Sequence, residues 1–217
     1  MSRVQDEGDL RRRMVTAMQT MDAQGLNRAT SGNVSVRFGE AMLVTPSGVP
    51  AGRLTPDQMV LVQANGSSPA DSLKPSSEWR MHQQILNRRP DIGAVVHCRS
   101  RHATILACAG RAIPPLHYMV AVSGGPSIPV APYATFGSRE LADSVVDTLA
   151  GGFAALMANH GQISVARSLE RALAVAEEVE EQAAVYWGTL AIGGPILLDE
   201  AEMTRVLERF QTYGQRR

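Results

Sequence analysis

Two histidines follow apolar segments that read as buried strands, and they are the residues best suited to metal or acid–base chemistry. His97 ends the run Gly93-Ala-Val-Val-His97, and His160 follows the apolar run 153–158. An imidazole at a strand end is well placed to bind a metal or to transfer a proton. A lone histidine is more often structural, however. Because strand side chains repeat every two residues, residue 99 points to the side of His97, and residue 99 is an arginine.

Three turns carry groups that bind anions. Thr30-Ser31-Gly32-Asn33 precedes a predicted strand, Thr45-Pro46-Ser47-Gly48 follows one, and Pro75-Ser76-Ser77-Glu78 begins a predicted helix. Hydroxyls, exposed backbone N–H groups and a helix N-terminus all favour phosphate. Each turn alone is explained as an ordinary turn or a helix cap. Their occurrence together in a chain without net charge favours a shared phosphate site.

The hydrophobic periodicity predicts the scaffold that must position these residues. Apolar spacings of three and four predict helices over residues 9–24, 78–89, 100–109, 168–190 and 201–210. Alternation and short apolar runs predict strands over 33–37, 41–44, 59–62, 93–97, 118–122, 153–158 and 162–165. Short turns between the first strands favour antiparallel pairing. We expect one α/β domain, residues 1–217, with a mixed or antiparallel central sheet flanked by helices.

Other polar and reactive residues are interpreted as parts of the scaffold. His82 lies one turn into a predicted helix and reads as a surface or packing residue. The acidic run 177–181 reads as a solvated helix face. Cys98 alternates with His97 and is expected to point away from it.

Composition excludes several classes of function. The 21 basic and 21 acidic residues cancel, which argues against general binding to nucleic acid or to an anionic membrane. No apolar run reaches the roughly 18 residues of a membrane span. The N-terminus has no targeting pattern, and two cysteines are too few for a disulfide scaffold. We therefore expect a cytoplasmic protein.

The motifs, taken in order, resemble the class II aldolases of the fuculose-phosphate aldolase type, a family that also contains ribulose-phosphate epimerases and methylthioribulose-phosphate dehydratases. The resemblance runs from about Leu10 to Gly214 and rests on GLNRATSGNVSVR, LVTPSGVP, KPSSEWRMH, AVVHC, IPPLHYMVAVSGG, PVAPYATFGSREL, NHG and FQTYG. It implies zinc-dependent retro-aldol cleavage of a ketose 1-phosphate to dihydroxyacetone phosphate and a small aldehyde. Lactaldehyde, acetaldehyde and a methylthio-aldehyde all remain open as that aldehyde.

The resemblance also implies roles for individual residues. By this resemblance Glu78 would be the acid/base, able to touch the metal when the site is empty. Tyr118 would protonate or deprotonate the aldehyde oxygen, and Phe136 and Tyr213 would shape the aldehyde end. The resemblance further implies that Tyr213 would lie on a mobile C-terminal tail, residues 211–217. The family forms homotetramers with sites between subunits. The residues implied to bind the substrate phosphate are Gly32, Asn33, Ser47, Gly48, Ser76 and Ser77.

The chain departs from the family at the metal. The family binds Zn²⁺ through a His-x-His pair and a His-Gly turn, but here the pair reads His97-Cys98-Arg99, with His160 in the turn. Guanidinium stays protonated and cannot ligate a metal. Four accounts follow: His97, His160 and Glu78 hold the metal; Arg99 replaces the metal as an electrostatic stabiliser; His102 moves in; or Arg99 was introduced into an active aldolase.

Two other functions remain open at this point. One is an epimerase or dehydratase on the same scaffold, because related chemistry serves each reaction. The other is a metal-poor, non-catalytic protein that binds a sugar phosphate, and Arg99 is the residue that favours it.

Overall fold

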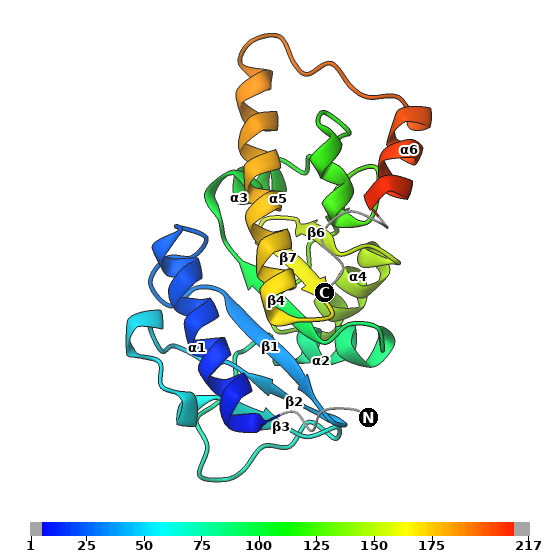
Figure 1. The fold of residues 1–217 in the computed structure, drawn as a ribbon. Helices are drawn as coiled ribbons and strands as arrows, with labels where there is room; N and C mark the ends of the chain where they lie inside the picture. The colour runs from blue at the N-terminus through cyan, green and yellow to red at the C-terminus, as the bar shows by residue number, and fades with distance from the viewer. Residues whose placement is uncertain (1–5, 211–217) are drawn as a thin grey trace.

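The computed structural model describes residues 6–210, and Figure 1 shows their arrangement. The α-helices are α1 (Glu7–Ala23), α2 (Trp79–Arg88), α3 (Arg101–Cys108), α4 (Arg139–Leu149), α5 (Leu169–Leu190) and α6 (Glu200–Phe210). The strands are β1 (Asn33–Phe38), β2 (Ala41–Val44), β3 (Val60–Val62), β4 (Ala94–Cys98), β5 (Val130–Ala131), β6 (Ala154–Met157) and β7 (Gly161–Ala166). Three 3₁₀ helices join them: η1 (Ala51–Arg53), η2 (Pro56–Gln58) and η3 (Tyr118–Ser123).

The strands form one seven-stranded sheet in the order β3-β2-β1-β4-β7-β6-β5. All neighbours pair antiparallel except β5 and β6, which are parallel. This confirms the expected α/β fold with a mixed, mostly antiparallel sheet. Strands β1 and β4, far apart in the sequence, are neighbours at its centre.

Helices cover both faces of the sheet because its central strands are buried on both sides (Figure 1). Helices α2 and α4 pack on one face, in the apolar cluster that contains Val95. Helices α1 and α5 pack on the other, in the cluster that contains Val34, Val96 and Cys98. Cys98 therefore points away from the Val95 side, as its alternation with His97 predicted.

Residues 118–122 form no strand, so that prediction was wrong. They belong to the 3₁₀ helix η3, which begins where the His117 side chain accepts a hydrogen bond from the Met119 N–H and ends at Gly124 in the left-handed region. Val120 and Ala121 are buried among α5 and α6, so their apolar pattern reflects helix packing instead of a sheet face.

Helix α4 and the short strand β5 were not predicted from the sequence. The Ser138 hydroxyl caps α4 by accepting from the Leu141 N–H, and apolar residues at spacings of three and four face the core. The sequence carries a signal for the start of α4, a serine at the N-cap followed by Arg-Glu-Leu. No helix among residues 6–210 is long and apolar enough to cross a membrane.

Candidate active site

A buried carboxylate with two imidazoles is the centre of the site. Glu78 Oε1 lies 2.8 Å from His160 Nε2, and Glu78 Oε2 lies 3.2 Å from His97 Nε2. Three elements contribute: Glu78 stands at the N-cap of α2, His97 lies in β4, and His160 lies in the turn between β6 and β7. All three side chains are at least nine-tenths buried.

The β1–β4 ladder positions His97. Its Cα faces that of Asn33 across the ladder. His97 Nδ1 lies 2.8 Å from the Gln162 backbone oxygen, and since a carbonyl only accepts, Nδ1 must donate. Nε2 of the neutral ring then carries a lone pair toward Glu78. Burial keeps the pKa of His97 below its usual value, against the attraction of Glu78.

Close backbone contact positions His160. Asn159, immediately before it, has a φ of 55°, a left-handed conformation that asparagine tolerates. At Gly161, immediately after it, a Cβ would lie 2.5 Å from the Cys98 carbonyl oxygen and 3.3 Å from Arg99 Cγ. A side chain at residue 161 would therefore separate the start of β7 from the end of β4.

Glu78 is held in its ionised form. Burial alone would raise the pKa of this carboxyl, but the neighbouring His97 and His160 and a hydrogen bond from Asn33 keep it well below its usual range. The Asn33 Nδ2 donates to Glu78 Oε2 at 3.0 Å. The site thus holds a fixed anion beneath a polar opening.

These groups fit a divalent metal. Their candidate ligand atoms all lie within 4.8 Å of one another. His97 Nε2 and Glu78 Oε1 are buried and lack a hydrogen-bond partner among the described groups, although His97 Nε2 lies 3.2 Å from Glu78 Oε2 and Glu78 Oε1 lies 2.8 Å from His160 Nε2. Two imidazole nitrogens and a carboxylate oxygen form a donor set suited to a divalent transition metal or zinc.

Arg99 lies beside this cluster. Its Nη2 is 3.3 Å from His160 Nε2. A single ring nitrogen cannot donate to Glu78 and accept from Arg99 at once, so the two contacts compete for His160. The guanidinium adds a positive charge where a third imidazole was expected.

A polar cavity of about 210 Å³ opens beside Glu78. The loops around Ser47 and Ser76 form one wall, joined by hydrogen bonds from Ser47 N to Lys74 O and from Ser76 N to Thr45 O. Gly32 must be glycine, because its φ is 74° and a Cβ would lie 2.1 Å from the Asn27 side chain. The lining residues are Arg28, Ala29, Thr30, Ser31, Gly32, Asn33, Pro46, Ser47, Gly48, Ser76, Ser77, Glu78 and Arg99.

All six residues assigned to phosphate binding by resemblance therefore share one cavity with Glu78. Arg28, which the sequence analysis did not single out, also lines it. The sequence signal for Arg28 is its position two residues before the turn Thr30-Ser31-Gly32-Asn33, where a cation could help to bind an anion. Asn33 has a second contact as well, because its amide holds the Glu78 carboxylate.

The aromatic residues lie outside this cavity. Phe136 is 65% exposed and precedes Gly137, where a Cβ would lie 2.9 Å from the Ser77 carbonyl oxygen. Tyr118 is 50% exposed and lines a different hollow, formed with α6 and including Phe210. Tyr213 and the tail 211–217 lie outside the described residues.

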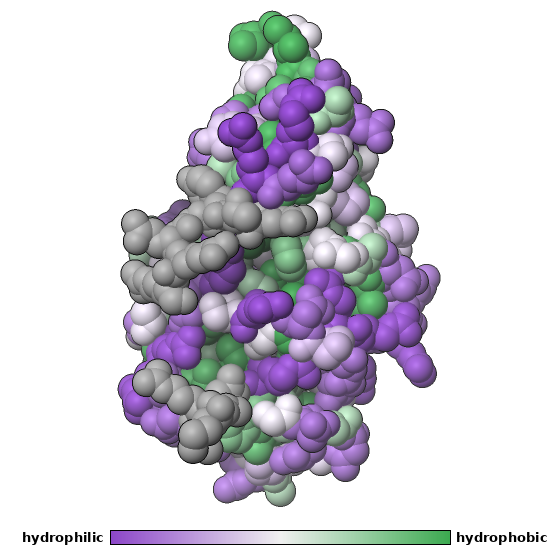
Figure 2. Space-filling model, turned by 45° about the vertical axis from the view of Figure 1, so that its right-hand side comes forward, coloured by the Kyte–Doolittle hydropathy of each residue, from purple (hydrophilic) through white to green (hydrophobic). Residues whose placement is uncertain are grey.

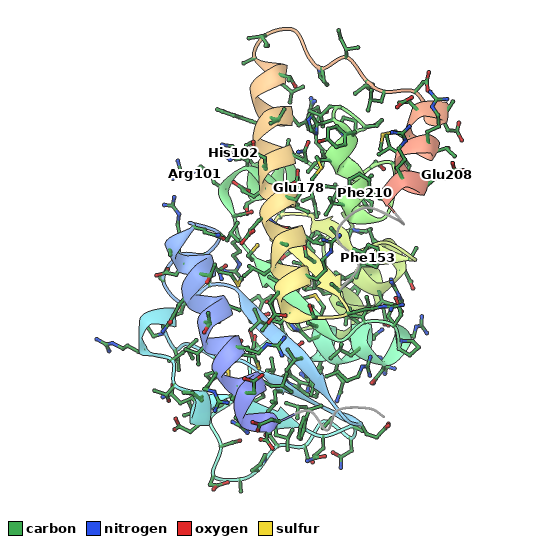
Figure 3. The ribbon with its side chains drawn as sticks, viewed as in Figure 1. Arg101, His102, Phe153, Glu178, Glu208 and Phe210 are labelled. Atoms are coloured by element: carbon green, nitrogen blue, oxygen red, sulfur yellow. The ribbon has the colours of Figure 1, made fainter. Side chains whose placement is uncertain are left out.

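The sequence analysis missed one buried and one partly buried polar contact. His82 is fully buried, and its Nδ1 lies 2.8 Å from Ser35 Oγ. Glu180 accepts from the N–H groups of His102 and Ala103 at the start of α3. His102 and Arg101 lie beside α5, which carries Glu180 (Figure 3). The acidic run is therefore not wholly a solvated face.

Comparison with known proteins identifies the family. The family described as Class II Aldolase and Adducin N-terminal domain matches residues 12–187. The chain belongs to this class II aldolase family.

Relatives in this family match nearly the whole chain. A 5-methylthioribulose-1-phosphate/5-deoxyribulose-1-phosphate aldolase of Rhodospirillum rubrum is 47% identical over 205 residues, 94% of this chain and 92% of the relative. An L-fuculose phosphate aldolase of Escherichia coli K12 is 45% identical over 212 residues, 97% and 98% of the two chains. A solved L-fuculose 1-phosphate aldolase superposes with a TM-score of 0.91 at 34% identity, covering 97% of this chain and 100% of its own.

Proposed function

We propose that this class II aldolase cleaves a ketose 1-phosphate to dihydroxyacetone phosphate and a small aldehyde, with Zn²⁺ as the metal. The observation that carries the proposal is the position of Glu78. Its carboxylate contacts two imidazoles and also lines the cavity of anion-binding turns. Relatives at 45–47% identity that are named ketose-phosphate aldolases support it and favour it over an epimerase or dehydratase.

The cavity supplies the substrate's orientation in this proposal. Gly32, Gly48 and the serines at 47, 76 and 77 offer backbone N–H groups and hydroxyls to a phosphate. Binding energy from a phosphate distant from the reacting carbon fixes the ketose against Glu78. The cavity of 210 Å³ suits a small polar group better than an apolar ligand.

In this proposal, side chains of the protein transfer the protons of the cleavage. In the cleavage, the C4 hydroxyl gives its proton to the group at the aldehyde end, which we propose is Tyr118, the C3–C4 bond breaks with its electron pair left on C3, and C3 then takes up a proton that comes from solvent. Glu78, oriented by Asn33, is the group that we assign to the proton at C3. A bound divalent metal would polarise the substrate oxygens and stabilise the negative charge that develops on them. Glu78, His97 and His160 would hold it.

The relatives suggest which substrates to compare. The two most informative relatives are named for 5-methylthioribulose or 5-deoxyribulose 1-phosphate and for fuculose phosphate. The ketose 1-phosphates that would give a methylthio-aldehyde, acetaldehyde or lactaldehyde differ only at the end remote from the phosphate. We therefore place selectivity among them at the aldehyde end, where we propose that Tyr118, Phe136 and Tyr213 act.

The decisive experiment measures dihydroxyacetone phosphate release from each of the three ketose 1-phosphates, with metal content determined on the same samples. We expect cleavage that depends on metal and is lost in Glu78→Gln. The matched control is Glu40→Gln, an exposed carboxylate outside the site, which should retain full turnover. Conversion of the ketose without carbon–carbon cleavage would contradict the proposal.

We also propose that the protein works as a homotetramer with sites shared between subunits. Apolar side chains gather at the far end of α5 and in the loop after it, where Ile192 is 84% and Ile196 is 94% exposed. Figure 2 shows this apolar tip. A monomer rarely exposes such a patch without a binding role. Within one chain Tyr118 lines a different cavity from Glu78, which also fits a site completed by a neighbour.

Subunit mixing tests this assembly. Glu78→Gln and Tyr118→Phe proteins are each expected to lose most activity. After dissociation and reassembly together, they should regain turnover, because some sites combine an intact Glu78 with an intact Tyr118. Light scattering should give four chains per particle. Mixtures that stay inactive, or a monomeric particle, would refute shared sites.

A further inference from the structure

The cavity beside Glu78 has a charge requirement that its neutral donors cannot meet. A substrate phosphate dianion would share 210 Å³ of polar space with the Glu78 side chain, which lines the same cavity. A metal held by Glu78, His97 and His160 would offset the charge of the carboxylate, and a phosphate dianion in the same space still favours a cationic partner of its own. The serines and glycines of the three turns orient an anion but carry no charge. Two cationic side chains line the cavity, Arg28 and Arg99.

Within the part of the chain that the structure describes, neither arginine forms an ion pair with a carboxylate. Among residues 6–210, the carboxylates that pair with arginines pair with other ones, such as Arg11, Arg13 and Arg89. Arg99 has a contact with His160 through one nitrogen, Nη2, which leaves the remaining guanidinium donors for a ligand. An unpaired arginine in a cavity of phosphate-binding turns matches the geometry that phosphate prefers.

Arg99 is the better positioned of the two. It follows directly after β4, and the close approach of Gly161 to Cys98 O and Arg99 Cγ fixes its backbone against β7. Its contact with His160 further limits its orientation. Both arginines are exposed, but the hydrogen bonds that hold Arg28 in the turn before β1 use its backbone atoms and bind Ser31. A preorganised donor loses less freedom when an anion binds.

We propose that Arg99 binds the phosphate of the substrate. At a position where the family pattern has a metal ligand, this chain thus has an anion ligand. Arg99 then favours phosphorylated ketoses over free ones and links the phosphate cavity to the Glu78 cluster. The substrate class rests on the proposed aldolase function, but phosphate binding by Arg99 can be measured without turnover.

The test is titration of inorganic phosphate into the full-length protein after chelator treatment and dialysis, followed by calorimetry. Removing the metal ensures that phosphate does not bind to it. We expect Arg99→Gln to weaken binding about 10- to 100-fold, the usual effect of losing a charged hydrogen-bond partner. Arg99→Lys should recover part of the affinity because it keeps the charge. Thermal melts establish that each variant is folded.

The matched control is Arg101→Gln. Arg101 carries the same charge two residues away and forms no ion pair within the described chain, but it does not line the cavity. Arg101 lines a neighbouring hollow with Arg28 and Arg99, and we expect the phosphate affinity of Arg101→Gln to stay within about two-fold of the parent, because an exposed charge outside the phosphate cavity has a small effect. Equal losses in Arg99→Gln and Arg101→Gln would indicate a general charge effect and overturn the proposal. So would a parent protein that does not bind phosphate.

A second readout separates this proposal from the proposed function. Arg99→His should gain metal affinity while losing phosphate affinity, and in turnover assays Arg99→Gln should raise KM more than it lowers kcat. Arg99→His with unchanged phosphate binding would refute the role of Arg99. A parent protein that binds phosphate through Arg99 but cleaves no ketose 1-phosphate would refute the aldolase function alone.

Discussion

Asn33 and His97 face each other across the β1–β4 ladder, and both side chains reach the same oxygen of Glu78. Asn33 Nδ2 is 3.0 Å and His97 Nε2 is 3.2 Å from Glu78 Oε2. A single register pair between two strands thus fixes both groups against the carboxylate. A shift of one residue would turn both side chains to the opposite face of the sheet.

Asn33→Leu should remove the hydrogen bond from the Asn33 amide to Glu78 while leaving the contact between His97 and Glu78. Glu78 would keep its charge but lose a buried donor, which costs about 1–3 kcal/mol of unfolding free energy. Urea denaturation of the metal-free protein measures this loss. Asn87→Leu, at an exposed position of α2, is the control and should change stability by less than about 0.5 kcal/mol. Equal stability of the Asn33 variant and the parent would show that the hydrogen bond to Glu78 contributes little.

Gly161→Ala should displace His160. The new Cβ would lie 2.5 Å from the Cys98 carbonyl oxygen, a backbone atom that cannot move without disturbing the β4–β7 pair. We expect a loss of about 1–3 kcal/mol, typical of overpacking, together with weaker metal binding. In Gly188→Ala, the added methyl group meets nothing within 4 Å in helix α5, so this variant should be slightly more stable. Calorimetric Tm values and metal titrations check both; normal metal affinity in Gly161→Ala would count against this account of the turn.

Glu180→Gln should weaken the start of α3, the helix that follows Arg99. The carboxylate accepts from the His102 and Ala103 N–H groups, and a neutral amide accepts less strongly. We expect about 0.5–2 kcal/mol of destabilisation by chemical denaturation. Glu181→Gln, an exposed neighbour, is the control. Similar losses in the two variants would mean that the effect is only that of net charge.

His82 predicts how stability depends on pH. Burial lowers the pKa of its imidazole from 6.5 to about 3, with a smaller contribution from His97 and an opposing one from Glu78. The folded chain keeps His82 neutral, whereas the unfolded chain takes up a proton below about pH 6.5. The unfolding free energy should therefore fall as pH drops from 6.5 toward 3, by up to about 1.4 kcal/mol per pH unit for this group.

Urea denaturation of the metal-free protein at pH 7.5, 6.0 and 5.0 measures that slope, and His82→Gln should flatten it. Comparison of the two proteins removes the contribution of other groups, such as His97, that titrate in both. The neutral variant cannot take up the extra proton on unfolding. Parallel pH profiles for the parent and His82→Gln would exclude this assignment.

The sequence by itself determined the fold class, most elements and the identities of the reactive groups. Within residues 6–210, the apolar periodicity correctly predicted five of the six α-helices and six of the seven strands, because burial of one face leaves a local pattern in the sequence. It also placed His97 at a strand end and Glu78 at a helix start. The pattern over 118–122 misled because helix packing and strand packing both produce short apolar runs.

The tertiary structure decided which of these groups meet. Glu78, His97 and His160 lie far apart in the chain, and only the pairing of β1, β4 and β7 and the docking of α2 bring them within hydrogen-bonding distance. The same pairing places Arg99 beside both His160 and the phosphate cavity. Local sequence reports local propensity, whereas register and contact between distant strands are decided by burial of the whole sheet.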